Sequence, residues 1–129
     1  MLKLTYIENS FHLEHLAKSL EEWVALRVIL VLRMGECLCV EPSTASFLLP
    51  ANLPGVDLLK AEVERQETDA LDLCACDAKY VEVSLKGTWL ASDSESAEGV
   101  FVAALSDSSE FFLLKLWQEA QIGASVLSD

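Results

Sequence analysis

The sequence predicts an α+β fold: an antiparallel sheet of about five or six strands with an N-terminal helix, a middle helix and a C-terminal helix. Three observations support it. Some stretches alternate apolar and polar residues, as half-buried strands do, and others repeat apolar residues at helical spacing. The chain has 129 residues, enough for one hydrophobic core and too few for two. We therefore expect a single α+β domain over residues 1–129.

The composition is both apolar and acidic. Hydrophobic residues make up 52% of the chain, and the formal net charge is −12. The apolar residues are numerous enough to offset the entropy lost on folding. The negative charge repels nucleic-acid phosphates and anionic lipids. We therefore expect no nucleic-acid or membrane partner, and instead another protein of basic character or a cation.

The N-terminus and the longest apolar stretch bear on localisation. Residues 1–16 hold one lysine and then acids and histidines, which is not the pattern of a signal peptide. Residues 24–40 are apolar but interrupted by Arg27, Arg33 and Glu36, so they are too short for a membrane-spanning helix. We expect a cytoplasmic protein whose thiols stay reduced.

The first elements are expected to be a short segment and a helix. Residues 3–8, KLTYIE, predict a short strand or an ordered tail. The side chain of Asn9 or Ser10 can cap a helix, and apolar residues then recur at helical spacing over residues 11–22. An N-terminal helix is therefore predicted there.

Residues 24–34 alternate between two faces and are rich in β-branched side chains, which favours a strand with one buried and one mixed face. A continuing helix is the alternative, which Gly35 disfavours. The mixed face places two apolar residues between two arginines, and an apolar patch rimmed by charge is typical of protein-binding surfaces. The candidate partner-binding residues are Arg27, Ile29, Val31 and Arg33. The alternative is that helices cover both faces of the sheet.

Further strands and a middle helix are expected after residue 35. The predicted strands lie at residues 36–41, 46–50, 70–77, 80–90 and 100–105. Residues 56–66, VDLLKAEVERQ, also alternate like an exposed strand, but their Ala, Glu, Lys, Arg and Gln content favours a helix.

The C-terminal helix is expected to begin at a capping box. Asp107 would cap it and Glu110 would complete the box, with Gly123 as its end. Its apolar stripe is wider than one packed face needs. The candidate self-association residues, in a homodimer, are Phe111, Leu114 and Trp117.

The four cysteines form two Cys-x-Cys pairs, Cys37 with Cys39 and Cys74 with Cys76. In a strand, residues two positions apart share a face, so two neighbouring strands could bring four thiolates to a zinc ion. Structural zinc sites usually space their cysteines by two to four residues on a turn, which this pattern lacks. Burial as small apolar side chains is the favoured interpretation, and a disulfide fits a reducing compartment poorly.

Histidines and an acidic loop are the other metal candidates. His12 and His15 would share a helix face, but no third ligand lies near them in the sequence. Asp93, Glu95 and Glu98 offer oxygen ligands, yet Glu98 occupies the position where a calcium loop of the EF-hand type needs glycine. We predict no metal and no cofactor. A calcium- or metal-binding regulatory protein is the alternative function.

Catalytic motifs are absent from the sequence. The five glycines are scattered, so no phosphate-binding loop forms, and there is no G-x-S-x-G motif. We expect no enzyme. An acidic inhibitor or immunity-type protein, which would cover a basic active site, is a further alternative.

The order of elements, the small size, the acidic balance and the wide apolar C-terminal helix resemble the class I type III secretion chaperones. The resemblance covers nearly the whole chain, but it lies in architecture and composition and implies no site residues. It implies a homodimeric α+β protein that holds an extended segment of a secreted effector along apolar strand faces. We therefore expect a non-enzymatic, chaperone-like protein-binding module.

Overall fold

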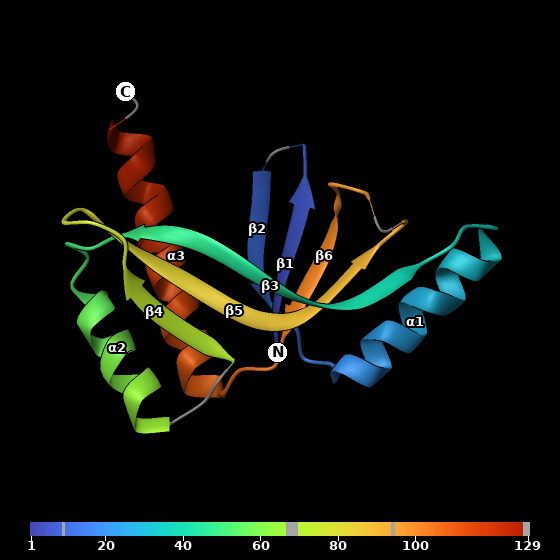
Figure 1. Ribbon diagram of the computed structural model, residues 1–129, viewed down its shortest axis with the longest axis horizontal. Coiled ribbons are helices and arrows are strands. Elements are labelled where there is room, and N and C mark those ends of the chain that lie inside the picture. Colours follow the sequence, from blue (N-terminus) through green and yellow to red (C-terminus); the bar gives the residue numbers. More distant parts are fainter. Residues whose placement is uncertain (9, 67–69, 94, 128–129) are drawn as a thin grey trace. The chain divides into compact units, whose positions relative to one another are not determined.

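The computed structural model describes residues 1–8, 10–66, 70–93 and 95–127 (Figure 1). These residues form three helices and a six-stranded antiparallel sheet, which confirms the predicted α+β class with an N-terminal, a middle and a C-terminal helix. The strand order is β2-β1-β6-β5-β3, and β4 pairs with β5. No helix in these ranges is long and apolar enough to cross a membrane.

The chain divides into two compact units. Unit 1 comprises Met1–Thr44 and Lys86–Ala104, and unit 2 comprises Ala45–Leu85 and Leu105–Asp129. Two long strands, β3 (Cys39–Pro50) and β5 (Tyr80–Ala91), contribute residues to both units.

Unit 1 begins with a hairpin of β1 (Leu2–Ile7) and β2 (Ser10–His15), and β1 also pairs with β6 (Gly99–Ala103). The predicted helix over residues 11–22 was therefore wrong in its first half. The Ser10 hydroxyl donates to the Ile7 carbonyl at 2.8 Å, so it tightens the hairpin turn instead of capping a helix.

Helix α1 (Leu20–Arg33) follows, and the predicted strand over residues 24–34 was wrong. Ser19 is the N-cap, because its side-chain oxygen accepts the backbone N–H of Glu22 at 3.3 Å. Gly35, with φ of 75°, takes the left-handed conformation that commonly follows a helix. The β-branched residues therefore lie in a helix with a cap at its start and a glycine after its end.

The core of unit 1 includes a buried cluster of Leu90, Val100 and Val102. Partly buried apolar side chains from the first hairpin, α1 and the start of β3 cover this cluster: Met1, Leu16, Leu20, Trp23, Val24 and Leu38. No residue of α1 is fully buried, so this helix rests on the unit through one face only.

In unit 2, β3 places Ala45, Phe47 and Leu49 in the core, while Ser46 and Leu48 between them are exposed. The predicted break between strands at residues 36–41 and 46–50 was wrong, because β3 runs on through Pro42. Since β3 ends the strand order, the missing N–H of a proline is tolerated there.

The remaining predicted elements are confirmed: β4 (Leu71–Ala75), β5, β6 and the helix α2 (Gly55–Gln66). Helix α3 (Asp107–Leu127) continues past Gly123, which was expected to end it. Buried side chains at the core of this unit are Val56, Leu59, Leu71, Val83, Leu113 and Leu116.

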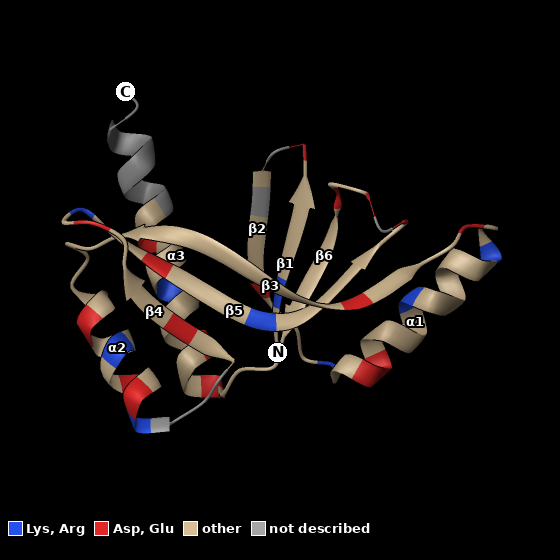
Figure 2. Cartoon of the chain, viewed as in Figure 1, with Lys and Arg blue, Asp and Glu red and all other residues tan. Residues whose placement is uncertain are grey.

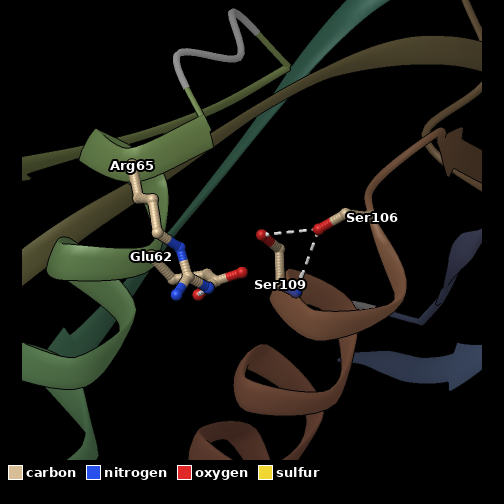
Figure 3. Close-up of polar contacts among 4 residues, drawn as sticks. All are labelled: Glu62, Arg65, Ser106 and Ser109. Carbon is tan, nitrogen blue, oxygen red and sulfur yellow. Dashed lines mark hydrogen bonds and ion pairs between the residues drawn. The ribbon is translucent and has the colours of Figure 1, made fainter.

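A small polar cluster lies between α2 and the first turn of α3 (Figure 3). Glu62 is only 5% exposed, and its carboxylate pairs with the guanidinium of Arg65 one turn later. At the start of α3, the Ser109 N–H donates to the Ser106 hydroxyl oxygen at 3.2 Å. Ser106, and not the predicted Asp107, is therefore the N-cap of α3.

Candidate functional site

The most unusual surface of unit 1 is the solvent side of α1. Four large apolar side chains, one to three positions apart along about two turns, are 45–69% exposed. They define the outer face of α1: Leu26, Ile29, Leu30 and Leu32. Soluble proteins scatter such residues singly, and a contiguous group of them marks a surface that another molecule covers.

Because residues 24–33 are helical, the four residues predicted to share one strand face lie on two sides of α1. Residues four apart in a helix share a face, so Ile29 and Arg33 lie on the solvent side, where both are exposed. Arg27 and Val31 lie toward the sheet of unit 1, and both are half-buried. The predicted face is thus split into one outer and one inner pair.

Charged residues stand at the ends of the outer face (Figure 2). Glu21 and Glu22 lie in the first turn of α1, and Arg33 lies in the last. Glu36 lies three residues after the end of the helix and is exposed. The apolar face therefore has more acidic than basic groups around it, as does the chain as a whole.

On the inner side of α1, Arg27 lies over the ring of Trp23, with its guanidinium carbon 5.4 Å from the ring centroid. Lys3 Nζ is 5.7 Å from the same centroid and forms an ion pair of 3.0 Å with Glu14. Trp23 thus holds two cations by cation–π contacts. Arg27 Nε is inaccessible to solvent and has no hydrogen-bond partner among the described residues.

Arg27 also lines a pocket of about 310 Å³ in unit 1. The other walls are the end of β1 (Thr5 to Ile7), the start of β6, and the loop between β5 and β6 with Ser92, Ser96 and Glu98. This volume lies at the lower end of the range for small-molecule sites, roughly 300–1,000 Å³.

An aromatic pair stands beside this pocket. The Tyr6 ring meets the Trp89 ring edge to face, with centroids 5.6 Å apart. Burial raises the pKa of Tyr6 above its usual 10.0, since the phenolate would lose hydration. Tyr6 is therefore a neutral hydroxyl at physiological pH.

The predicted self-association residues differ in exposure. Phe111 is 63% exposed and meets Phe112 edge to face at 5.9 Å. Trp117 packs edge to face on Phe47 with centroids 6.1 Å apart, and Leu114 is half-buried. Only the first of the three residues presents most of its side chain to solvent.

The predicted burial of the cysteines was wrong. Cys37, Cys74 and Cys76 are exposed and Cys39 is half-buried, and all four are free thiols. Cys37 and Cys39 belong to unit 1, whereas the other pair belongs to unit 2. The Cys-x-Cys spacing arises in surface segments, so packing in the core does not explain it.

The other metal candidates are not brought together. His12 and His15 lie on β2, where residues three apart point to opposite faces of the sheet. In the acidic loop, the Glu95 N–H donates to Asp93 Oδ1 at 2.9 Å, and Ser96 Oγ donates to the Glu98 carbonyl at 3.0 Å. Within the described ranges, no group of three metal-ligating side chains occurs.

Sequence reasoning missed the pocket. Its walls come from β1, α1 and the segment before β6, and the pairing of Tyr6 with Gly99 joins positions 93 residues apart. The available signal was Arg27, a charge in the middle of an apolar stretch, but the strand pattern grouped it with the exposed residues Ile29 and Arg33.

Residues 1–121 match the model of the Alr0857-like family. No curated protein and no solved structure matches the chain. Since the family model covers nearly the whole length, the chain belongs to the Alr0857-like family.

Proposed function

We propose that this chain is a non-enzymatic protein-binding module that docks an apolar, basic-flanked segment of another protein on the outer face of α1. The observation that carries the proposal is the exposure of Leu26, Ile29, Leu30 and Leu32 on a helix with no fully buried residue. Holding such a segment reversibly is a chaperone-like activity.

Charge complementarity selects the partner. Glu21, Glu22 and Glu36 stand near the ends of the face, against the exposed bases Lys18 and Arg33, and the whole chain carries −12. Basic residues beside the partner's apolar side chains would meet these carboxylates. A second copy would bring the same acidic groups together, and like charges across an interface cost free energy.

The size of the face favours a transient complex. Fully burying a large apolar side chain contributes about 1.5–3 kcal/mol, so covering four that are already half-buried adds roughly 3–6 kcal/mol. Association itself costs about 4–15 kcal/mol. The face alone therefore gives weak binding, and flanking ion pairs must supply the rest.

Self-association through α3 has less support. A stable interface buries about 800 Å² per partner, whereas an aromatic side chain contributes roughly 150–250 Å². Phe111 is the one strongly exposed residue of the predicted set. We therefore assign the binding function to α1. Light scattering will test whether the expected homodimer forms.

The experiment uses a synthetic helical peptide with leucines at positions i, i+3, i+4 and i+7 and lysines between them. We expect it to shift the amide NMR signals of α1, and a peptide of the same composition with scattered leucines to bind at least about tenfold more weakly. Ile29→Lys should weaken binding of the patterned peptide about tenfold, because it removes an apolar contact and adds a like charge.

Leu58→Lys is the matched control, since Leu58 is a 60% exposed leucine on a different helix, α2, and is not one of the four residues of the proposed face. Light scattering of each variant reports the oligomeric state. Equal binding of the two peptides, or equal weakening by the two variants, would overturn the proposal. A dimer that Ile29→Lys converts to a monomer would instead assign the face to a second copy.

A further inference from the structure

The pocket on the inner side of α1 is lined by a half-buried cation, the guanidinium of Arg27. Arg27 Nε is shielded from water, and its N–H donates to no acceptor among the described residues. An unsatisfied donor on a charged group costs more than the hydrogen bond it forgoes, so native proteins rarely keep one without a use. The stack on Trp23 fixes the plane of the guanidinium, and the Arg27 side chain lines the pocket.

The same pocket is also lined by a carboxylate that has no ion-pair partner among the described residues. Glu98 lines the pocket from the loop before β6, and its side chain is exposed. Within the described part of the chain, neither Arg27 nor Glu98 has an ion-pair partner, so they do not neutralise each other. The loop backbone under Glu98 is held, since its N–H donates to Ser96 Oγ at 3.3 Å.

Two opposite charges that line one pocket without pairing are complementary to a molecule that carries both charges. A plain anion would gain from Arg27 and be repelled by Glu98, and a plain cation the reverse. The remaining walls include the apolar side chains of Ile7 and Val100 and the hydroxyls of Thr5 and Ser92. These walls suit a small ligand with a short apolar part.

We propose that this pocket binds a small zwitterion, a free α-amino acid with an apolar side chain, whose carboxylate pairs with Arg27 and whose ammonium group pairs with Glu98. The site lies on the opposite side of α1 from the outer face, so this proposal does not depend on the proposed function. It gives the module a ligand site directly beneath its docking helix.

The test titrates L-leucine into ¹⁵N-labelled protein, with acetate and butylamine as half-ligands. L-leucine is expected to shift the Arg27 Nε–H signal and the amide signals of Ser96 and Gly99. Each half-ligand should bind at least about tenfold more weakly, because it loses one charged pair. No shift at ~10 mM L-leucine, ten times a weak Kd of ~1 mM, would overturn the proposal.

Two variants separate the two charges. Arg27→Met keeps a long side chain over Trp23 and should abolish the response, whereas Arg33→Met, on the exposed end of α1, is the matched control and should keep it. Glu98→Gln, at an exposed loop position, should weaken L-leucine about tenfold and leave or improve acetate binding. Acetate binding as tight as that of L-leucine, or equal effects of the two arginine variants, would contradict a zwitterion site.

Discussion

The backbone N–H of Ser109 donates to the hydroxyl oxygen of Ser106 at 3.2 Å, and the two serine hydroxyls lie 3.0 Å apart. This places the cap of α3 one residue before the position that a capping-box pattern predicts. Both Ser106 and Asp107 are good capping residues, and their sequence alone does not rank them. The register of the helix decides, since Glu110 donates its N–H to the Ser106 carbonyl at 3.0 Å.

Ser106→Ala should lower the free energy of unfolding by about 1 kcal/mol, because the Ser109 N–H at the buried start of α3 loses its acceptor. Asp107→Ala is the matched control and should cost less, roughly 0.3–1 kcal/mol, from the helix dipole alone. Urea unfolding monitored by circular dichroism measures both. A larger loss for Asp107→Ala would mean that the cap lies at Asp107.

Gly87→Ala should destabilise the fold by about 3 kcal/mol or more. An added Cβ would collide with the Val102 carbonyl oxygen and lie 2.9 Å from Phe101 Cζ, and neither β6 backbone nor a buried ring can move away cheaply. Thermal unfolding of the purified variant, or its failure to accumulate as folded protein, reports the effect.

Gly35→Ala offers the contrasting glycine. Nothing lies within 4 Å of an added Cβ there, but its φ of 75° costs an L-residue about 1–2 kcal/mol. Gly35→Asn should cost less than Gly35→Ala, since asparagine tolerates this conformation. If neither variant changed the free energy of unfolding, Gly35 would not adopt the left-handed conformation at the end of α1.

The fold class was predictable from sequence because, in several segments, the apolar residues recur at the spacing of either a strand or a helix and not of both. Alternation over residues 80–90 and the helical composition of residues 56–66 each matched the structure. Residues 24–34 failed because apolar side chains occupy nearly every position, so strand and helix periods fit equally well. A helix that leaves an apolar face in water lacks the polar side by which a helix is usually recognised.

The candidate sites were predictable only in part. Ile29 and Arg33 are exposed, but they lie on a helix and not on the predicted strand. Arg27 and Glu98 line one pocket because strands far apart in the chain pair with each other, which no local pattern encodes. The cysteines were assigned to the core from their usual burial, but their surface position follows from the ends of β3 and β4.

The exposed cysteines should react in the native state. We expect Cys37, Cys74 and Cys76 to be modified rapidly by a thiol reagent without denaturant, and half-buried Cys39 to react more slowly. Mass spectrometry of peptides after timed alkylation assigns each site. Adding EDTA beforehand should leave the rates unchanged, and a chelator-dependent rate would indicate a bound metal. Protection of three or more thiols would contradict their exposure.

Stability at alkaline pH should depend on Tyr6. Burial raises its pKa above 10.0 in the folded chain, whereas the unfolded chain keeps a value of about 10. Below pH ~10 both states hold the proton and the contribution to stability is complete. As the pH rises further, the unfolded state releases its proton first, so the free energy of unfolding falls through the folded-state pKa.

Tyr6→Phe removes this titration while keeping the ring that meets Trp89 at 5.6 Å. The variant should therefore lose less stability than the wild type between pH ~8 and pH ~11 in paired urea titrations. The ultraviolet absorbance change of tyrosine ionisation should lose its component above pH ~10 in the same variant. Parallel pH profiles for the two proteins would show that the Tyr6 hydroxyl reaches solvent, and that the pocket beside it is wider than the structure has it.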